Sequence, residues 1–359
     1  MILLVATLVS LTLMNGGNDR GIEARAAPAF GEMLKIDVHA HFFDEMPEFV
    51  EMLQRINMRV VNICVYGTRP ELLEPAEQRA EALYQTYRGS LYFASTFDLT
   101  RRNEPDYAEQ VIAWLDRTFE AGALMVKIWK EVGMELKKPD GTYLMPDDPV
   151  FDPIYEHLAK RGKPLMAHLA DPIDAWLPLD PSSVHYRYFS SNPKWHVYGR
   201  EGVPSHADIL AARDNIMVKH PDLVVIGAHL GSMAHDVDEV AKRFDRFPNF
   251  YVDVSARTPV LRQQSREKVR KFFIKYQDRI LYGLDASKFT EKGTPSEEER
   301  VAFTKAIEKT YRAEYRYYAG KGTPMTGARD IECLGLPREV LEKFYHKNAQ
   351  RLMPALAER

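Results

Sequence analysis

The stretch LKIDVHAH, residues 34–41, is an apolar run that ends in two histidines, His39 and His41. This run has the length and composition of a buried parallel strand, and its histidines lie at or just past the carboxyl end. The carboxyl ends of the strands in a closed parallel barrel all face one mouth, so we expect these side chains to converge. Three later stretches repeat the form: PLMAHL (164–169, His168), LVVIGAHL (223–230, His229) and RILYGLD (279–285, Asp285).

Strand-like and helix-like segments alternate along most of the chain. Charged stretches with a 3.6-residue period separate the apolar runs and predict helices at Asp106–Glu120, Ala234–Phe247 and Arg262–Tyr276. Eight βα units of this kind predict an α/β fold that closes into a (β/α)₈ TIM barrel. The predicted strands are Leu34–Val38, Val60–Val65, Leu91–Thr96, Ala123–Trp129, Lys163–Ala167, Leu223–Ala228, Phe250–Val254 and Ile280–Leu284.

A long insertion follows the fifth predicted strand, from Asp171 to about Ser205, and is rich in aromatic and basic residues. A loop of this length at the catalytic mouth favours a lid or a substrate pocket, with Trp176 as a substrate-binding candidate. The alternative is a structural excursion that packs on the barrel or on another subunit. A second segment, Thr310–Arg338, is expected to hold a helix end and a surface loop.

The N-terminus differs from the rest of the chain. Residues 2–14 form an apolar run too short to span a bilayer, and Ala24-Arg25-Ala26 fits a small-residue cleavage site. We therefore predict a signal peptide at residues 1–26 and one enzyme domain over residues 30–359. This predicts export to the periplasm or the medium, and no membrane association after cleavage. Without cleavage, the location would be cytoplasmic.

Composition excludes several classes of protein. A hydrophobic content of 45% and a charged content of 28% are typical of a globular protein. The net charge of −3 gives no reason to expect a nucleic-acid partner. Cys64 and Cys333 are too few for a disulfide scaffold. We therefore expect a small-molecule substrate.

The pair His39 and His41 has the spacing of a metal-binding motif. Residues two apart on a strand point to the same face, about 6.5–7 Å apart, so both imidazoles can reach one ion. Asp37 is close enough in sequence to orient the rings by hydrogen bonds. Taken alone, each of these residues could instead cap a strand or a helix.

The ordered motifs resemble those of the amidohydrolase superfamily, and more narrowly its amidohydrolase 2 branch, which includes aminocarboxymuconate-semialdehyde decarboxylase. The resemblance covers roughly residues 34–353. It rests on HAHF after the first strand, MAHLADP around His168, GAHLGS around His229, YGLDAS around Asp285 and the closing KNAQRLM, residues 347–353.

The resemblance implies a role for each motif residue. His39, His41, His168 and Asp285 would bind a divalent metal, most simply one Zn²⁺ with a position left open for water. Asp285 would also take a proton from that water, and His229 would polarise the substrate or orient the water. A homodimer is a further implication of the resemblance.

Three basic residues near the ends of predicted strands bear on this site. Lys127, in ALMVKIWK at the fourth strand, stands where binuclear members carry a carboxylated lysine that bridges a second ion. It could equally bind a substrate carboxylate or pair with an acid of the barrel. Lys130 should face the other side of a regular strand. Arg257, just beyond the seventh strand, is a candidate for gripping an anionic group.

The sequence thus predicts a metal-dependent hydrolase that attacks an amide, ester or lactone of a small carboxylated substrate. The alternative is a lyase, a non-oxidative decarboxylase of an aromatic or unsaturated acid that uses the same site. A third hypothesis is an exported binding protein that has lost catalysis.

Overall fold

The computed structural model describes residues 27–288, 295–322 and 332–358. The signal peptide predicted at residues 1–26 lies outside the described residues and stays a prediction. Among the described residues, no helix combines the length and the apolar composition needed to cross a bilayer.

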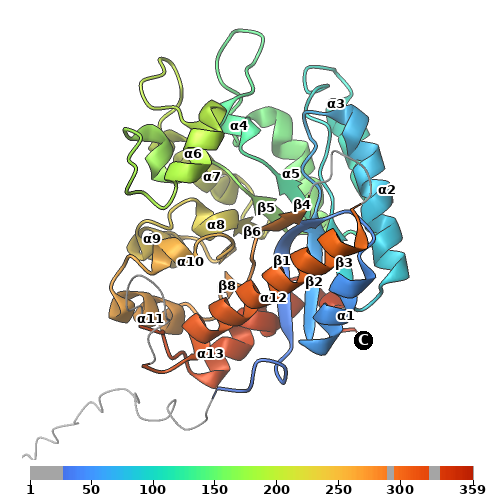
Figure 1. Ribbon diagram of the computed structural model, residues 1–359. Coiled ribbons are helices and arrows are strands. Elements are labelled where there is room, and N and C mark those ends of the chain that lie inside the picture. The colour runs from blue at the N-terminus through green and yellow to red at the C-terminus, as the bar shows by residue number, and fades with distance from the viewer. Residues whose placement is uncertain (1–26, 289–294, 323–331, 359) are drawn as a thin grey trace, which may run out of the picture.

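The strands form a parallel barrel (Figure 1). One set pairs in the order β4-β5-β6-β7-β8 and the other in the order β3-β2-β1-β9, with a bridge from Ser95 to Val126 joining β3 to β4. The bounds are β1 Lys35–Phe42, β2 Met58–Ile63, β3 Leu91–Ala94, β4 Val126–Ile128, β5 Leu165–Ala167, β6 Val225–Gly227, β7 Phe250–Asp253, β8 Ile280–Leu281 and β9 Ala286–Lys288.

The eighth strand closes the ring in two pieces, β8 against β7 and β9 against β1. Between the pieces, Val38 N donates to Tyr282 O at 3.0 Å and Asp285 N donates to His39 O at 2.7 Å. The predicted (β/α)₈ barrel is confirmed, and each predicted strand overlaps an observed one.

Helices follow the strands and cover the outside of the barrel (Figure 1). The longer ones are α1 Pro47–Arg55, α2 Pro70–Thr86, α3 Tyr107–Glu120, α5 Asp152–Arg161, α7 His206–Lys219, α9 Val237–Arg246, α11 Arg266–Lys275 and α12 Glu297–Ala319. The shorter ones are α4 Glu131–Met134, α6 Tyr186–Ser191, α8 Ala228–Gly231, α10 Thr258–Leu261, α13 Arg338–Glu342 and α14 Asn348–Leu352.

Two apolar layers follow from the two faces of the strands. Ile36, Val38, Met166 and Leu281 belong to an inner cluster, which the C-terminal residues Met353 and Leu356 join from below. The alternate residues, such as Ala40 and Phe42 of β1, belong to the larger cluster between barrel and helices. The C-terminal segment therefore closes the end of the barrel opposite the mouth.

A bulge in β1 turns the histidine pair inward. The register against β2 shifts between Asp37 and Ala40, so one extra residue enters the strand. Ile36 and Val38 face the interior before the bulge, and His39 and His41 face it afterwards, while Asp37 is left on the outer side. The bulge thus lets apolar residues fill the lower barrel and imidazoles line its mouth from one strand.

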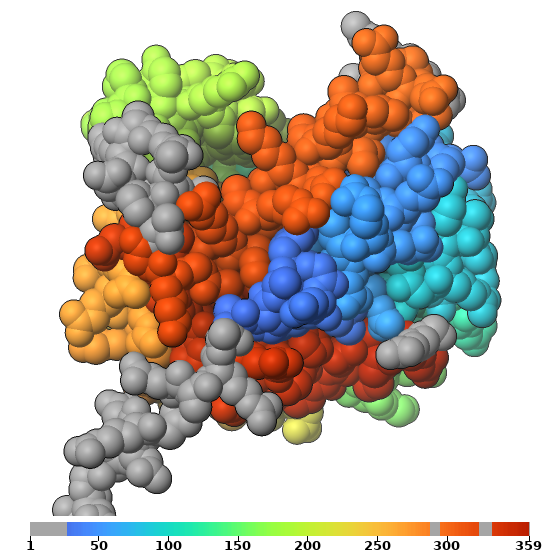
Figure 2. Space-filling model, turned by 60° about the horizontal axis from the view of Figure 1, so that its bottom comes forward, coloured from blue at the N-terminus to red at the C-terminus, as the bar shows by residue number. Residues whose placement is uncertain are grey.

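Helix α12 lies along the outer face beside α1 and α13 (Figure 2). It starts at a capping box formed by Ser296 and Glu299. Its inner side carries Glu314, which accepts a hydrogen bond from Tyr282 of the eighth strand at 2.9 Å. The helix ends at Ala319, inside the segment Thr310–Arg338 where a helix end was expected, and residues 323–331 lie outside the described part of the chain.

The insertion after β5 is compact rather than extended. It contains short 3₁₀ turns at Ile173–Trp176 and Pro193–Trp195 and the helix α6. Phe189 and Trp195 are buried against the barrel, whereas Tyr188 is partly exposed and lines the mouth. Both functions considered for this segment are therefore present, packing and pocket formation.

Glu314 should make folding stability depend on pH. Burial raises its pKa to about 7, against an ordinary value of 4.5. The folded state then holds its proton more tightly than the unfolded state, so stability falls as pH rises from about 4.5 to about 7. We expect Glu314→Gln to remove up to about 3 kcal/mol of this fall, measured by urea unfolding at several pH values.

Glu308→Gln on the same helix is the matched control. Pairing with Arg55 and Arg312 lowers the pKa of Glu308 to about 2, so its stabilising effect is lost only in strong acid. Equal slopes for Glu314→Gln and the parent between pH 4.5 and 7 would contradict the prediction.

Candidate active site

A cavity of about 670 Å³ opens at the carboxyl ends of the strands. The side chains on its floor come from strands far apart in the sequence, namely His39 and His41 (β1), Lys127 (β4), His168 (after β5), His229 (after β6) and Asp285 (after β8). The convergence expected from the sequence is therefore present in the fold.

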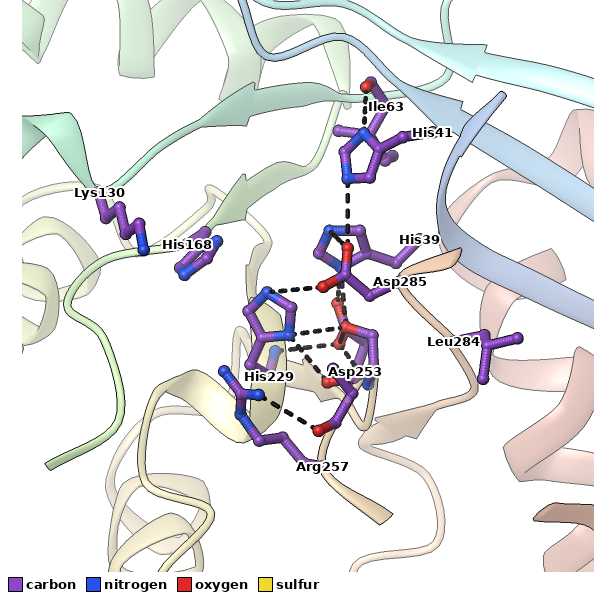
Figure 3. Close-up of polar contacts among 12 residues, drawn as sticks. His39, His41, Ile63, Lys130, His168, His229, Asp253, Arg257, Leu284 and Asp285 are labelled. Carbon is purple, nitrogen blue, oxygen red and sulfur yellow. Dashed lines mark hydrogen bonds and ion pairs between the residues drawn. The ribbon is translucent and has the colours of Figure 1, made fainter. Parts of the chain in front are cut away.

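His39, His41 and Asp285 form the centre of this floor (Figure 3). Asp285 Oδ1 lies 3.3 Å from His41 Nε2 and 3.7 Å from His39 Nε2. His41 Nδ1 donates to Ile63 O at 2.8 Å, so Nε2 is the ring nitrogen that faces the Asp285 carboxylate.

Asp285 is ionised. Burial acts to raise its pKa, but contact with His41 and the nearby His39 and His229 hold the pKa well below its usual range. Its backbone is left-handed, with φ of 63°. Gly283, two residues earlier, permits the approach to β1, because a Cβ there would lie 3.0 Å from that of His39.

His229 opens a run of left-handed residues that continues to Ser232, with φ near 60° throughout. Such backbone costs energy in residues other than glycine and is concentrated at functional sites. Buried bonds hold the turn, with Arg213 donating to Gly231 O at 2.7 Å and Ser232 Oγ donating to Leu169 O at 2.8 Å. The fold therefore fixes His229 in a strained, left-handed backbone conformation.

Asp253 at the end of β7 was not predicted as a site residue. Its Oδ2 accepts from His39 Nδ1 at 3.0 Å, and its Oδ1 accepts from the backbone N–H groups of His229 and Ser255 and from the Ser255 hydroxyl. Burial acts to raise its pKa, but His39 and these hydrogen bonds hold the pKa well below its usual range. Asp253 therefore orients the site rather than offering a ligand.

His168 lies beside this centre. Its ring is 4.3 Å from that of His229, centre to centre. Its Nδ1 accepts a hydrogen bond from Trp129 Nε1 at 3.1 Å, and its buried Nε2 has no hydrogen-bond partner. Burial first, and then Lys127, lowers its pKa well below the usual range, so the ring is neutral.

Lys127 lies within the cluster, not at its edge. Its side chain is buried, and Nζ lies 3.1 Å from His39 Nε2. Burial lowers the pKa of this amine to about 8, although Asp253 and Asp285 act to raise it. Near pH 7 this amine is mostly protonated and suits an anion, while its smaller neutral fraction can react with carbon dioxide, so both roles considered for Lys127 remain open.

Lys130 faces the mouth, contrary to the prediction from a regular strand. Strand β4 ends at Ile128, so the alternation no longer applies two residues later. Its Nζ donates to both carboxylate oxygens of Asp171, at 2.6 and 2.7 Å, and to the Tyr188 hydroxyl at 2.6 Å. This buried ion pair ties the insertion to the barrel.

Two predicted substrate-binding residues do not line the main cavity. Trp176 donates from Nε1 to Pro204 O at 3.0 Å and packs against His206, so it serves the internal packing of the insertion. Arg257 lines a small cavity of about 10 Å³ and lies next to His229 in Figure 3. The Arg257 guanidinium donates a hydrogen bond to Ala256 O, and its side chain lies outside the main cavity.

Asp37 does not orient the imidazole rings. Its Oδ1 accepts from the backbone N–H groups of His39 and Leu284, at 2.9 and 3.1 Å, and its Oδ2 accepts from Tyr311 at 2.7 Å. The bulge places this carboxyl on the outer face, so it joins β1 to the eighth strand through the backbone. Asp253 takes the role that we had expected of Asp37.

The floor fits a divalent metal. The candidate ligand atoms of His39, His41 and Asp285 all lie within 4.8 Å of one another. Imidazole nitrogens with a carboxylate oxygen form a donor set typical of Zn²⁺ and similar ions. His39, His229 and Asp253 also form a close group, but the Asp253 oxygens already accept hydrogen bonds, so we interpret that group as a positioning network.

Comparison with known proteins identifies the family. The family model described as amidohydrolase matches residues 36–354. The chain belongs to the amidohydrolase family. This confirms the resemblance found in the motifs, and the family and its structural neighbours, among them a decarboxylase and a hydratase, are enzymes. No curated protein matches the sequence.

Solved structures share the fold at low identity. 2,6-Dihydroxybenzoate decarboxylase from Rhizobium has a TM-score of 0.53 and 14% identity, covering 90% of this chain and 99% of that one. 5-Carboxyvanillate decarboxylase from Novosphingobium aromaticivorans, solved with manganese and a nitrobenzoic acid, has a TM-score of 0.51 and 14% identity, covering 92% and 98%. A probable 2-pyrone-4,6-dicarboxylic acid hydrolase from Acinetobacter baumannii has a TM-score of 0.50 and 12% identity, covering 90% and 100%.

Asp253 offers a test of the positioning network. We expect Asp253→Asn to weaken the binding of a divalent metal by about 10–100-fold, because the amide N–H₂ group would face one of the N–H or O–H groups that now donate to Asp253. Chelator competition measures this affinity. Asp116→Asn is the matched control, since Asp116 also holds a histidine, His157, at 2.9 Å but lies outside the site. Equal affinity in both variants would contradict the role of Asp253.

Proposed function

We propose that this amidohydrolase is a metal-dependent hydrolase that uses activated water on an amide, ester or lactone of a small carboxylated substrate. The observation that carries the proposal is the contact of the Asp285 carboxylate with the imidazoles of His39 and His41 on the cavity floor. A carboxylate in that position can accept a proton from an attacking water.

The residues on the floor divide the chemistry between them. A divalent ion, which we propose to be Zn²⁺, would be held by His39, His41, Asp285 and one further imidazole, and would supply a Lewis acid that lowers the pKa of water. Asp285 accepts the proton from the water. Asp253 keeps His39 in the tautomer that presents Nε2 to the floor.

The cationic side chains of the cavity wall favour an anionic substrate. Lys127, Lys130, Arg69 and Arg79 line it, together with fewer acidic groups. Lys130 is already neutralised by Asp171, whereas Arg69, which precedes α2, and Arg79, in the middle of α2, are exposed. A carboxylated substrate could therefore be oriented by these guanidinium groups, with its reacting carbonyl toward the floor.

A decarboxylase is the second candidate. Trp129, Tyr66 and Tyr188 line the same cavity and provide flat apolar surfaces suited to an aromatic acid. In this reaction the floor would hold the carboxylate that leaves as carbon dioxide, and no water would enter the product.

Isotope labelling separates the two reactions. We expect one ¹⁸O atom from labelled water in the carboxylate of the product, because hydrolysis adds water across the scissile bond. The substrates to test are small carboxylated amides, esters and lactones, with aromatic carboxylic acids in parallel, and mass spectrometry gives the readout. Carbon dioxide release without labelling would establish the lyase, and activity that survives His39→Ala with His41→Ala would contradict both.

Metal content tests the number of ions. We expect near one metal per chain by elemental mass spectrometry, both in the parent and in Lys127→Ala. Lys127→Met is the companion variant, since it keeps the apolar stem that fills the buried position. Near two metals in the parent and fewer in both variants would instead make Lys127 a carboxylated bridging ligand.

A further inference from the structure

Part of the cavity wall is formed by two loops, one after β2 and one after β4. The first loop contributes Thr68 and Arg69, and the second contributes Glu131, the first residue of α4. All three line the same cavity as the histidine floor. Because both loops extend past the strand ends that hold the floor, these residues can contact the part of a substrate that points away from it.

The turn that carries Arg69 is tightly fixed. A Cβ on the buried Gly67 would lie 2.8 Å from Phe97 O, so the loops after β2 and β3 pack in direct backbone contact. Gly67 O accepts from Leu99 N at 2.6 Å, and Arg69 N donates to Tyr66 O at 3.0 Å. The Arg69 guanidinium lies over the Tyr66 ring, 5.0 Å from its centre.

Glu131 is fixed through its backbone. Its carbonyl oxygen accepts from the N–H groups of Glu135 and Leu136, at 3.0 and 2.9 Å. Gly133, which has a left-handed φ of 94°, donates from its N–H to Leu144 O at 2.8 Å. Moving Glu131 away from the cavity would therefore break several backbone hydrogen bonds.

The Glu131 carboxyl group has one oxygen paired and one unpaired. Thr68 Oγ1 donates to Glu131 Oε1 and so joins the two loops. Oε2 is buried and has no hydrogen-bond partner among the described residues. Only 6% of Glu131 is exposed, so bulk water is a poor source of the missing donor. A buried oxygen without a donor is costly in free energy, and a ligand in the cavity that donates to it removes this cost.

Arg69 acts on the same carboxyl group. Burial raises the pKa of Glu131, while the hydrogen bond from Thr68 and the charges of Lys194 and Arg69 act to lower it. In the described part of the chain, the Arg69 guanidinium lies over Tyr66 rather than in an ion pair with Glu131. A cationic donor and an anionic acceptor are therefore both available in this part of the wall.

We propose that Arg69 and Glu131 form a recognition subsite, in which Arg69 binds a carboxylate and Glu131 Oε2 accepts a hydrogen bond from a hydroxyl or an ammonium group of the substrate. The substrate class is then a carboxylic acid that also carries such a donor. An acid without the donor leaves Oε2 unpaired, which makes Glu131 a specificity-determining residue. The inference rests on the proposed use of this cavity for a carboxylated substrate, and it adds a second polar group that the substrate must carry.

Paired ligands test the subsite by titration calorimetry on the metal-loaded protein. The probes are benzoates substituted at position 3 or 4 with a hydroxyl, an aminomethyl or a methoxy group. We expect a hydroxy or aminomethyl acid to bind about tenfold or more tightly than the methoxy acid of the same ring position, because only the first two can donate to Oε2. A parent that shows no such preference at either position, or that binds none of these acids, would overturn the proposal.

Glu131→Gln should abolish this preference. With Thr68 still donating to Oε1, the amide N–H₂ takes the place of Oε2, so we expect the members of each pair to bind within about threefold of each other. Glu135→Gln is the matched control, because Glu135 is an exposed acid of the same loop that pairs with Lys194 at 2.7 Å. An undiminished preference in Glu131→Gln would overturn the role of Glu131. Should that variant fail to fold, Glu131→Asp gives the same test, since its shorter side chain withdraws the carboxylate from the ligand.

Arg69→Met tests the carboxylate half of the subsite. We expect it to weaken all of these acids by about tenfold and to leave the preference within each pair unchanged. Arg88→Met is the control, since Arg88 also lies over a tyrosine ring, that of Tyr84 at 5.7 Å, but does not line the cavity. Equal binding by both arginine variants would overturn the role of Arg69. These binding constants need no turnover, so a chain that proves to be a decarboxylase would contradict the proposed hydrolase and leave this test intact.

Discussion

The hydrogen bond from His39 Nδ1 to Asp253 Oδ2, 3.0 Å long, joins the first strand to the seventh inside the barrel. The same carboxylate receives the backbone N–H groups of His229 and Ser255. One buried charge therefore sets the tautomer of His39 and fixes the entry into the left-handed turn that carries His229. Such a carboxylate is stable without solvent only while its donors surround it, so its loss would disturb several parts of the floor together.

The outer face of β1 complements this arrangement. Asp37 accepts from the backbone N–H groups of His39 and Leu284, at the point where the eighth strand is divided into β8 and β9. The regular ladder is missing there, so a side chain supplies acceptors that a strand would otherwise provide. Asp285 follows directly in left-handed backbone. The break in the eighth strand and the hydrogen bonds that Asp37 accepts there together place the Asp285 carboxylate beside the histidine pair.

Much of this site could be predicted from the sequence, because strand ends and residue types are local properties. His39, His41, His168, His229 and Asp285 lie at the ends of apolar runs and converge as the barrel requires. Asp253 could have been found as well, since it is an acid two residues beyond the inward-facing Tyr251 of β7. The inward turn of β1 could not, because a bulge depends on the pairing register with β2 and leaves no mark in the alternation of residues.

The positions of Trp176 and Lys130 show a second limit. Trp176 was expected to bind substrate and instead packs inside the insertion, whereas Lys130 was expected to face away and instead lines the cavity beyond the end of its strand. The same limit applies to the histidines themselves. Sequence identifies an imidazole, but its protonated nitrogen is set by a partner from another element. His168 and His229 are the same residue type in the sequence. Their Nδ1 atoms differ in the structure, because the indole of Trp129 donates to one and the carbonyl of Ser255 accepts from the other. A ligand set inferred from residue types is therefore incomplete until the group at each Nδ1 is known.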